Sequence, residues 1–401
     1  MNLNSDSPIQ EPVWCPLISV DDHVLEPPTL FDGVPSKLRD AVPQMVTDDR
    51  GLPYWLIEGE RFGVSGMNAA TGRPMDEWRV ESIRYEDMRR GVWDPAARLA
   101  DMDAAGIWAS VNFGSLTWGF AGTRFAKMKD TAAGFASLQA YNNWMLDVWC
   151  ATDLNRYIPC QLPWLADSHI AAEEIRRNAD RGFRAVSFSE NPEGLGFPNI
   201  YSDYWDPFFA ACSETDTVVN LHVGSSGATR EGTVDSPDMV RVALFPLNGI
   251  EALVDWVSAK VPMRHPGIKI VLSEAGVSWV PFAIERLNRA DRQRTSSAWW
   301  GPSDPPPVEL VNRNFWFASL EDPSAFRLLD IIGEDRIMVE TDYPHPDSTW
   351  PDSQGLVRRD LSDLPDATVR KICFENAANL YRHPLPPNEG AFRGTLDRAS
   401  V

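Results

Sequence analysis

The feature that most constrains this chain is a regular alternation of short β-rich apolar runs with longer segments of helical spacing. The β-rich runs lie at 17–20, 107–113, 157–162, 183–188, 217–221, 268–272, 315–318 and 337–339. The helical segments lie at 93–105, 123–150, 168–181, 203–213, 249–260, 278–288, 323–332 and 367–381. Such alternation is typical of an α/β protein with a parallel sheet, and eight repeats predict a closed (β/α)8 TIM barrel.

Several connections are longer than a minimal barrel needs. Residues 28–92 form an insertion after the first strand, in which 54–62 alternates as a small hairpin would. The connections 224–247 and 289–313 follow the fifth and sixth strands. Loops of this length usually cover an active site or an interface. We therefore expect one distorted barrel domain over 1–401, with long loops over its carboxyl-terminal rim and a C-terminal arm at about 383–401.

The charge balance excludes two classes of partner. The chain has 57 acidic and 37 basic residues, a net charge of −20, whereas nucleic acids and anionic membranes both require a cationic face. No apolar run approaches the roughly 18 residues that span a bilayer, and the N-terminal residues lack the pattern of a secretory signal. The five scattered cysteines make no disulfide framework. We expect a cytoplasmic protein that acts on a small molecule.

Three of the six histidines lie at the carboxyl ends of predicted strands, where a barrel builds its site. These three are His23, His222 and His345. The others lie at helix starts or turns, where surface or packing roles are expected: His169, His265 and His383.

Acidic residues occupy the same strand ends. Asp21 is two positions before His23, so both side chains point the same way on a strand. Glu274 ends the sixth strand and Asp342 follows the eighth. A single carboxylate there is usually a helix cap, but a buried cluster would repel itself unless a divalent cation supplied the missing charge.

We therefore expect a metal site. The expected ligands are Asp21, His23, His222, Glu274 and Asp342. Imidazole and carboxylate ligands suit zinc, iron or manganese, and the absence of cysteine from these positions argues against a structural zinc. Glu190, Glu26 and Trp279 are further candidates for a ligand or a substrate contact.

The motifs that carry these residues are VDDHVLEP, RLADMDAAGI, LPWLAD, VVNLHVG, IKIVLSEAGVSWVPFAIERL, ETDYPHPDS and FENAANLYR. Together they span about 15–385. The chain resembles the amidohydrolase superfamily, in the amidohydrolase-2 branch that includes aminocarboxymuconate-semialdehyde decarboxylase and the resorcylate-type decarboxylases. The resemblance implies a metal at the mouth of a distorted barrel, with His222 as a ligand and Asp342 as both ligand and proton acceptor. It also implies a homo-oligomer, expected to be a dimer.

Two positions depart from the family pattern. The first strand carries Asp21-x-His23 in place of His-x-His, and Glu274 stands where the family usually has histidine. The set is therefore richer in oxygen than the usual mononuclear zinc site, which favours iron or manganese and allows one or two ions, with Glu274 as a bridge.

Two reactions suit such a site. The first is hydrolysis of an amide, ester or thioester of a carboxylic acid by metal-activated water. In it Asp342 acts as general base and then acid, and His345 assists the leaving group, holds a substrate carboxylate or only supports Asp342. The alternative is non-oxidative decarboxylation of an aromatic or unsaturated acid, with Asp342 or His345 protonating the carbon that loses carbon dioxide. From the residues we favour hydrolysis, because Glu274 replaces the histidine of the decarboxylases.

A third hypothesis is a catalytically silent barrel that only binds ligands. It is disfavoured because every substituted ligand position still carries a group that binds metal. Five tryptophans near the long loops either line an apolar substrate pocket or pack beneath the loops: Trp118, Trp279, Trp299, Trp300 and Trp350.

Overall fold

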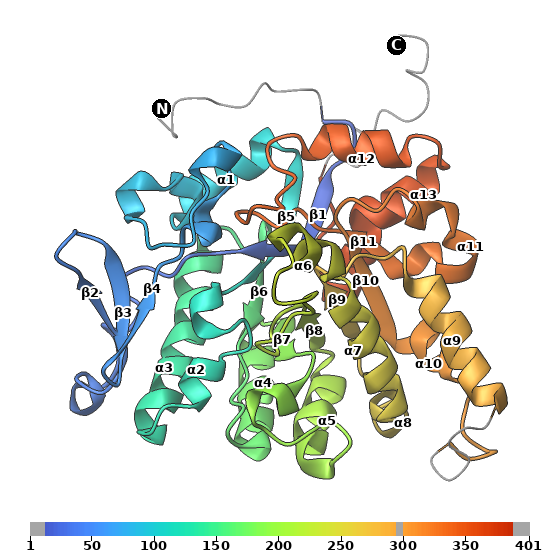
Figure 1. Cartoon of the computed structure of the whole chain (residues 1–401), viewed down its shortest axis with the longest axis horizontal. Coiled ribbons are helices and arrows are strands. Elements are labelled where there is room, and N and C mark those ends of the chain that lie inside the picture. The colour runs from blue at the N-terminus through green and yellow to red at the C-terminus, as the bar shows by residue number, and fades with distance from the viewer. Residues whose placement is uncertain (1–12, 294–299, 388–401) are drawn as a thin grey trace.

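Eight parallel strands in chain order form the central sheet of the computed structural model, which describes residues 13–293 and 300–387 (Figure 1). The strands are β1 (Leu17–His23), β5 (Ile107–Phe113), β6 (Tyr157–Gln161), β7 (Ala185–Ser189), β8 (Val218–His222), β9 (Ile270–Ser273), β10 (Phe315–Ser319) and β11 (Ile337–Val339). Each of the eight predicted runs overlaps one of them, with ends that differ by at most three residues.

The sheet closes where the first strand meets the segment that follows the last. The Asp342 amide donates to the Asp21 carbonyl at 2.9 Å, and the His23 amide donates to the Tyr343 carbonyl at 2.6 Å. The Thr341 hydroxyl adds a buried hydrogen bond to the Asp22 carboxylate at 2.6 Å. These contacts confirm the predicted (β/α)8 barrel, and they place the closing seam between β1 and the end of β11.

Helices surround the barrel (Figure 1). They are α1 (Pro95–Ala104), α2 (Thr123–Ala126), α3 (Thr131–Trp144), α4 (Ser168–Arg181), α5 (Asp206–Thr215), α6 (Asp238–Leu244), α7 (Leu247–Ser258), α8 (Val261–Arg264), α9 (Val280–Gln293), α10 (Pro307–Asn314), α11 (Leu329–Ile332), α12 (Ser353–Leu361), α13 (Asp366–Arg370) and α14 (Asn376–Tyr381). Helices α1, α3 and α4 begin after aspartates whose carboxylates accept amide hydrogen bonds from the first turn, at Asp94, Asp130 and Asp167.

The single helix expected at 123–150 is wrong. Helix α2 ends at Ala126, and Asp130 starts α3 afresh by accepting a hydrogen bond from the Ala133 amide at 3.0 Å. A π-helical turn over Met145–Trp149 then follows α3. Helices α6 and α10 were not predicted, because they lie almost entirely within the stretches 224–247 and 289–313 that were interpreted as connections. Helix α12 lies between the last predicted strand and the last predicted helix, where no element was expected.

The insertion after β1 carries a small antiparallel sheet, seen on the left of Figure 1. Its strands are β2 (Gln44–Thr47), β3 (Pro53–Ile57) and β4 (Glu60–Gly63), so the hairpin expected at 54–62 is present and gains one more strand. Trp55 of β3 packs against Trp118, with ring centroids 5.2 Å apart. Trp118 is fully buried and therefore supports the insertion rather than lining an open pocket.

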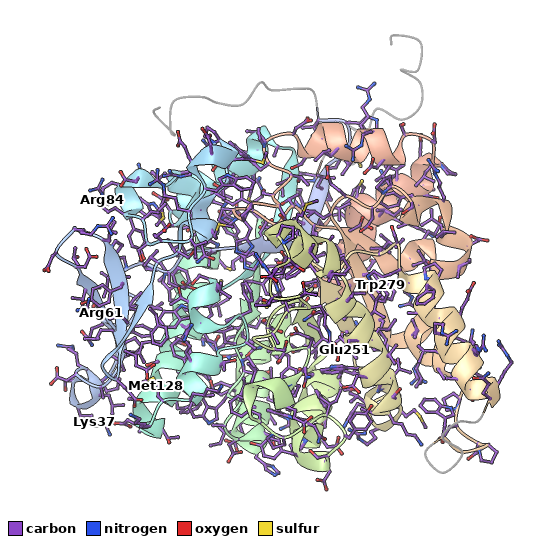
Figure 2. The ribbon with its side chains drawn as sticks, viewed as in Figure 1. Lys37, Arg61, Arg84, Met128, Glu251 and Trp279 are labelled. Carbon is purple, nitrogen blue, oxygen red and sulfur yellow. The ribbon has the colours of Figure 1, made fainter. Side chains whose placement is uncertain are left out.

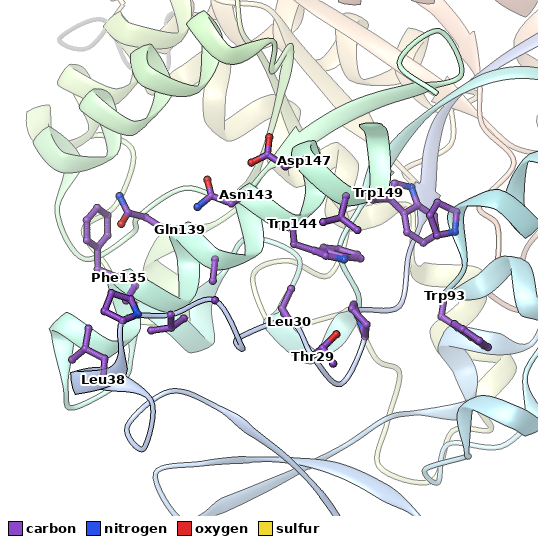
Figure 3. Close-up of a pocket in the computed structure, with 18 of the residues that line it drawn as sticks. Thr29, Leu30, Leu38, Trp93, Phe135, Gln139, Asn143, Trp144, Asp147 and Trp149 are labelled. Carbon is purple, nitrogen blue, oxygen red and sulfur yellow. The ribbon is translucent and has the colours of Figure 1, made fainter. Parts of the chain in front are cut away.

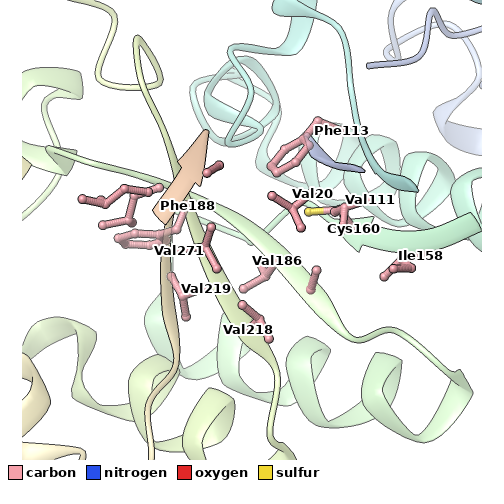
Figure 4. Close-up of a cluster of buried hydrophobic side chains, with 14 of the residues drawn as sticks. Val20, Val111, Phe113, Ile158, Cys160, Val186, Phe188, Val218, Val219 and Val271 are labelled. Atoms are coloured by element: carbon pink, nitrogen blue, oxygen red, sulfur yellow. The ribbon is translucent and has the colours of Figure 1, made fainter. Parts of the chain in front are cut away.

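Branched and aromatic side chains of the barrel strands form a buried apolar cluster (Figure 4), in which Phe188 packs outward against Phe208 of α5 and Trp256 of α7. Val20, Val111, Val186 and Val219 are completely buried, and so is Phe188. Burial of each such side chain contributes about 1.5–3 kcal/mol relative to exposure. All five cysteines are buried and free. Within the described ranges no helix has both the length and the apolar character needed to cross a bilayer.

Candidate metal centre

The carboxyl ends of the first, fifth and last barrel strands bring four predicted residues together. Asp21 and His23 lie on β1, His222 is the last residue of β8, and Asp342 follows β11. All four side chains are buried, with exposed fractions of 1% or less. Figure 2 draws the side chains on the ribbon and labels Trp279, which directly precedes α9.

The ligand atoms of these residues converge. Nε2 of His23 lies 3.2 Å from Oδ1 of Asp21 and 3.5 Å from Oδ1 of Asp342. Nε2 of His222 lies 3.5 Å from Oδ2 of Asp21 and 3.4 Å from Oε2 of Glu274. Two groups of three residues are close enough to share an ion, with ligand atoms within 4.8 Å of one another: Asp21, His23 and His222; and His23, Asp342 and His345.

The two central imidazoles are oriented as metal ligands are. Nδ1 of His23 lies 3.1 Å from the Gly114 carbonyl, and Nδ1 of His222 lies 2.8 Å from the Val223 carbonyl. A carbonyl only accepts, so each Nδ1 carries the proton and each Nε2 presents its lone pair. The two Nε2 atoms are 3.0 Å apart. Facing lone pairs at this distance repel each other unless a cation or a proton lies between them.

The carboxylates at the same place lack partners. Both oxygens of Asp21 and Oδ2 of Asp342 are buried and accept no hydrogen bond from any residue that the structure describes. Burial raises the pKa of Asp21, and it raises the pKa of Asp342 well above its ordinary value with help from the neighbouring Asp21 charge. Burial also lowers the pKa of His222 to about 4. Carboxylate oxygens without hydrogen bonds and two Nε2 lone pairs that face each other fit a divalent cation. Its positive charge would stabilise the ionised carboxylates and remove the repulsion between the lone pairs.

Glu274 lies at the rim of the cluster and is the least buried member, with a side-chain exposure of 13%. Its backbone φ of 56° and the φ of 48° at Asp342 are left-handed, a conformation that costs about 1–3 kcal/mol and concentrates at functional sites. Burial raises the pKa of Glu274 well above its ordinary value, and the charges of Asp342 and Asp21 raise it further.

His345 contacts the cluster through Asp342. Its Nδ1 lies 2.9 Å from Oδ1 of Asp342, and its ring centroid lies 4.0 Å from that of His23. Burial lowers the pKa of His345 to about 4. The pair Asp342–His345 therefore offers a route for one proton between a carboxylate and an imidazole beside the candidate metal.

The three further candidates lie outside these ligand groups. Glu26 accepts hydrogen bonds from the Ser115 amide at 2.9 Å and the Ser115 hydroxyl at 2.7 Å. Glu190 accepts from the amides of Gly224 and Ser226 at 3.0 and 2.8 Å, so both its oxygens are engaged. Trp279 donates to the Ala275 carbonyl at 2.7 Å. In this structure the two glutamates hold the loops after β5 and β8 in place.

Of the three remaining tryptophans expected near a pocket, the structure describes the surroundings of two. Trp350 is buried, donates to the Asp101 carbonyl at 3.0 Å and lies beneath Arg89. Trp300 is half-buried and donates to the Pro305 carbonyl at 3.1 Å. Trp299 falls outside the described residues.

Sequence reasoning missed two residues of the centre. Glu340 is buried and accepts a hydrogen bond from the Glu274 amide at 3.0 Å, and its other oxygen has no partner among the residues described. Phe120 stacks on His222 with ring centroids 4.1 Å apart and lies 5.1 Å from the ring of His23. The spacing of Glu340 and Asp342 on one face was visible in the sequence, whereas no pattern marks Phe120.

A cavity of about 880 Å³ lies away from the candidate metal centre (Figure 3). It runs between residues 27–38 of the insertion and the outer face of α3, and its walls include Phe135, Trp144 and Trp149. None of the candidate ligands lines it, so its size alone does not mark it as the active site.

The comparisons with known proteins agree with this architecture. The model of the Amidohydrolase family matches residues 30–383. The solved amidohydrolase map2389c of Mycobacterium avium subsp. paratuberculosis K-10 is 23% identical, with a TM-score of 0.72 over 92% of this chain and 99% of that chain. A dihydroxybenzoic acid decarboxylase of Polaromonas sp. JS666, solved with bound manganese and 2-nitroresorcinol, is 15% identical, with a TM-score of 0.60 over 92% and 97%.

Two curated relatives are named decarboxylases. Decarboxylase orsB of Emericella nidulans is 27% identical over 206 residues, which are 48% of this chain and 60% of that protein. The 2-amino-3-carboxymuconate-6-semialdehyde decarboxylase of Dictyostelium discoideum is 22% identical over 275 residues, which are 67% and 71% of the two chains. The aligned part of this chain thus covers less than two thirds of the length of orsB and slightly more than two thirds of the Dictyostelium decarboxylase.

Proposed function

Because the chain belongs to the amidohydrolase family, we propose that it is a metal-dependent non-oxidative decarboxylase of an aromatic or unsaturated carboxylic acid. The observation that carries the proposal is the position of the Nε2 atoms of His23 and His222. They face each other at 3.0 Å, next to the buried carboxylate oxygens of Asp21 that accept no hydrogen bond from the described residues. The names of both curated relatives favour decarboxylation over the hydrolysis that the residues alone led us to expect.

We assign the metal to Asp21, His23 and His222, with Asp342 and Glu274 within reach of the same imidazoles. Manganese is supported by the metal-bound neighbour, and it suits a mixture of carboxylate and imidazole ligands. When bound, the metal would withdraw electron density from the substrate carboxylate and an adjacent oxygen. Gly114 and Val223 hold the imidazoles through their Nδ1 protons, so both Nε2 atoms stay directed at the metal.

The protein's own part in the reaction is to deliver one proton. The substrate R–COO⁻ takes up H⁺ at the carbon that bears the carboxylate, and R–H and CO₂ leave. Oδ1 of Asp342 lies 3.5 Å from Nε2 of His23 and 2.9 Å from Nδ1 of His345, so Asp342 is the group best placed to give that proton. A proton from solvent then restores Asp342 through His345, which takes it up at Nε2 and passes the Nδ1 proton across the 2.9 Å contact.

Hydrolysis stays a second candidate because of one observation. Glu274 brings an extra carboxylate oxygen to within 3.4 Å of His222, at a strand end where the decarboxylases resembled by the sequence have histidine. An additional carboxylate at that point suits a base that activates water. The two reactions differ in their products, since only decarboxylation releases the carboxyl carbon.

The test uses manganese-loaded protein in oxygen-18 water, with a panel of ortho-hydroxylated benzoates and unsaturated acids labelled in the carboxyl carbon and with the amides and esters of the same acids. We expect labelled CO₂ and no oxygen-18 from labelled water in the organic product. Asp342→Asn should slow release of CO₂ by about 100-fold or more, as loss of a general acid does, whereas exposed Asp76→Asn should not. Oxygen-18 in a carboxylate product, without CO₂, would support hydrolysis instead.

A further inference from the structure

A smaller pocket lies next to the metal centre, between the β3–β4 hairpin of the insertion and two barrel loops. Its volume is about 370 Å³, within the range of small-molecule sites. Gly119 and Gly224 are among the residues that line it. Gly224 comes two residues after His222, and Gly119 precedes Phe120, whose ring stacks on His222. The pocket is therefore separated from the candidate ligands by only one or two residues of each loop.

The pocket collects positive charge in a strongly acidic protein. Arg124, Lys127 and Lys129 all line it, whereas the whole chain carries a net charge of −20. Within the described residues none of these three side chains has a carboxylate at salt-bridge distance, whereas Arg73, Arg84, Arg89 and Arg90 of the insertion do. A local excess of cations against an acidic background attracts anions to this point of the surface.

Arg124 is the most organised of the three. Its side chain is half-buried, Nε donates to the Thr117 carbonyl, and the guanidinium lies 3.8 Å from the centre of the Phe62 ring. These contacts fix the plane of the group and leave its two terminal nitrogens without a hydrogen bond in the part of the chain described. A fixed guanidinium with free terminal nitrogens is the arrangement that binds a carboxylate or phosphate through two parallel hydrogen bonds.

The two acidic residues of the pocket do not cancel this charge. Glu58 accepts the Asp130 amide at 3.0 Å and so serves the start of α3. Glu60 is close enough to influence Arg124 but forms no ion pair with it. The remaining wall is apolar and includes Ile57, Leu116 and Leu195, which suits the uncharged body of a ligand.

Resting on the proposed decarboxylase function, we propose that this pocket binds a second anionic group of the substrate through Arg124. The substrate is then an elongated acid with two charged ends. One carboxylate lies at the metal centre and reacts, the apolar body passes Leu116, and the distal anion pairs with Arg124 and the exposed Lys127. Met128 of the same pocket marks its position between the hairpin and the barrel in Figure 2.

The test measures binding rather than turnover, because the substrate is not needed for it. Calorimetric titration of the manganese-loaded protein compares glutarate, pimelate and azelate with the monocarboxylates of the same chain lengths. We expect at least one dicarboxylate to bind about tenfold or more tightly than its monocarboxylate, and salt to reduce this preference. Arg124→Gln should abolish the preference and leave monocarboxylate binding unchanged. Arg61→Gln, an exposed arginine of the same hairpin outside the pocket, should preserve it.

Equal binding of both series by the natural protein, or a preference that survives Arg124→Gln, overturns the proposal. If Arg124→Gln does not fold by circular dichroism, the double change Lys127→Gln and Lys129→Gln at exposed positions replaces it, and an unchanged preference then overturns the proposal. Release of CO₂ is a separate readout. A dicarboxylate preference without CO₂ release refutes the decarboxylase function alone, and CO₂ release without the preference refutes the pocket alone.

Discussion

The buried carboxyl of Glu26 gives a prediction whose size follows from the structure. Glu26 is fully buried and accepts both hydrogen bonds of Ser115. Burial raises its pKa from the ordinary 4.5 to about 7, although the hydrogen bonds from Ser115 oppose the change. The folded pKa lies above the unfolded one, so this group's contribution to stability is present below pH 4.5 and is lost as the pH rises through 7.

The interval from 4.5 to about 7 corresponds to about 3 kcal/mol of unfolding free energy, at about 1.4 kcal/mol per pH unit. Glutamine keeps an oxygen for the Ser115 amide, and its NH₂ donates to the Ser115 hydroxyl, but it does not ionise. Between pH 4.5 and 8 the stability of Glu26→Gln relative to the natural protein should therefore rise by about 3 kcal/mol. The variant becomes the more stable protein at pH 8 unless the exchange of oxygen for NH₂ costs more than this gain.

The assay is urea unfolding of the chelator-treated protein at several pH values, followed by tryptophan fluorescence. Glu58→Gln is the matched control, because hydrogen bonds from backbone amides, first that of Asp130, lower the pKa of Glu58 and reverse the sign of the pH effect. A difference between Glu26→Gln and the natural protein that stays constant with pH would refute the reasoning. Loss of manganese from Glu26→Gln would instead show that Glu26 is a metal ligand.

The remaining predictions concern the metal centre and its support. His222→Ala should abolish activity and reduce bound manganese to background in elemental analysis, whereas the exposed His169→Ala should change neither. Glu274→Gln should lower manganese affinity about tenfold or more, and unchanged metal content and rate would exclude it as a ligand. Arg98→Met should reduce the unfolding free energy by about 2–4 kcal/mol in urea titrations, because Arg98 is buried and donates to the carbonyls of Gly91 and His23 at 2.6 Å. Removal of the metal by a chelator should lower the melting temperature more at pH 8 than at pH 5. The pKa values of Asp21 and Asp342 are raised in the folded protein, so without metal their ionisation destabilises the fold as the pH rises. Equal decreases in melting temperature at both pH values would contradict this.

The barrel was predictable because its signal is local and repeated. Each strand is a short run of buried β-branched or aromatic residues, and the ends of such runs mark the rim where ligands gather. Asp21, His23 and His222 could be selected on that basis alone. Helix boundaries were less predictable, since Asp130 restarts a helix inside a segment whose apolar spacing continues on both sides.

The parts that failed depend on distant contacts. Whether Trp118 lines a pocket or supports a hairpin is decided by Trp55, and the two lie far apart in the sequence. Phe120 reaches His222 because the chain takes a left-handed turn with a φ of 53°, which no residue pattern announces. Glu340 could have been found from its spacing to Asp342, but its contact with the Glu274 amide joins two strand ends that lie 66 residues apart in the chain.

The closing seam gives the metal centre a role during folding. Asp21 and His23 come from the first strand, whereas Asp342 follows the last, so the two halves of the ligand set lie more than 300 residues apart in the chain. A growing polypeptide cannot assemble the site until β11 has been synthesised and has docked beside β1. Binding of the ion would then stabilise the closed barrel by linking its first and last strands. The backbone amide hydrogens of Asp342 and His23 should therefore exchange with deuterium far more slowly once manganese is present.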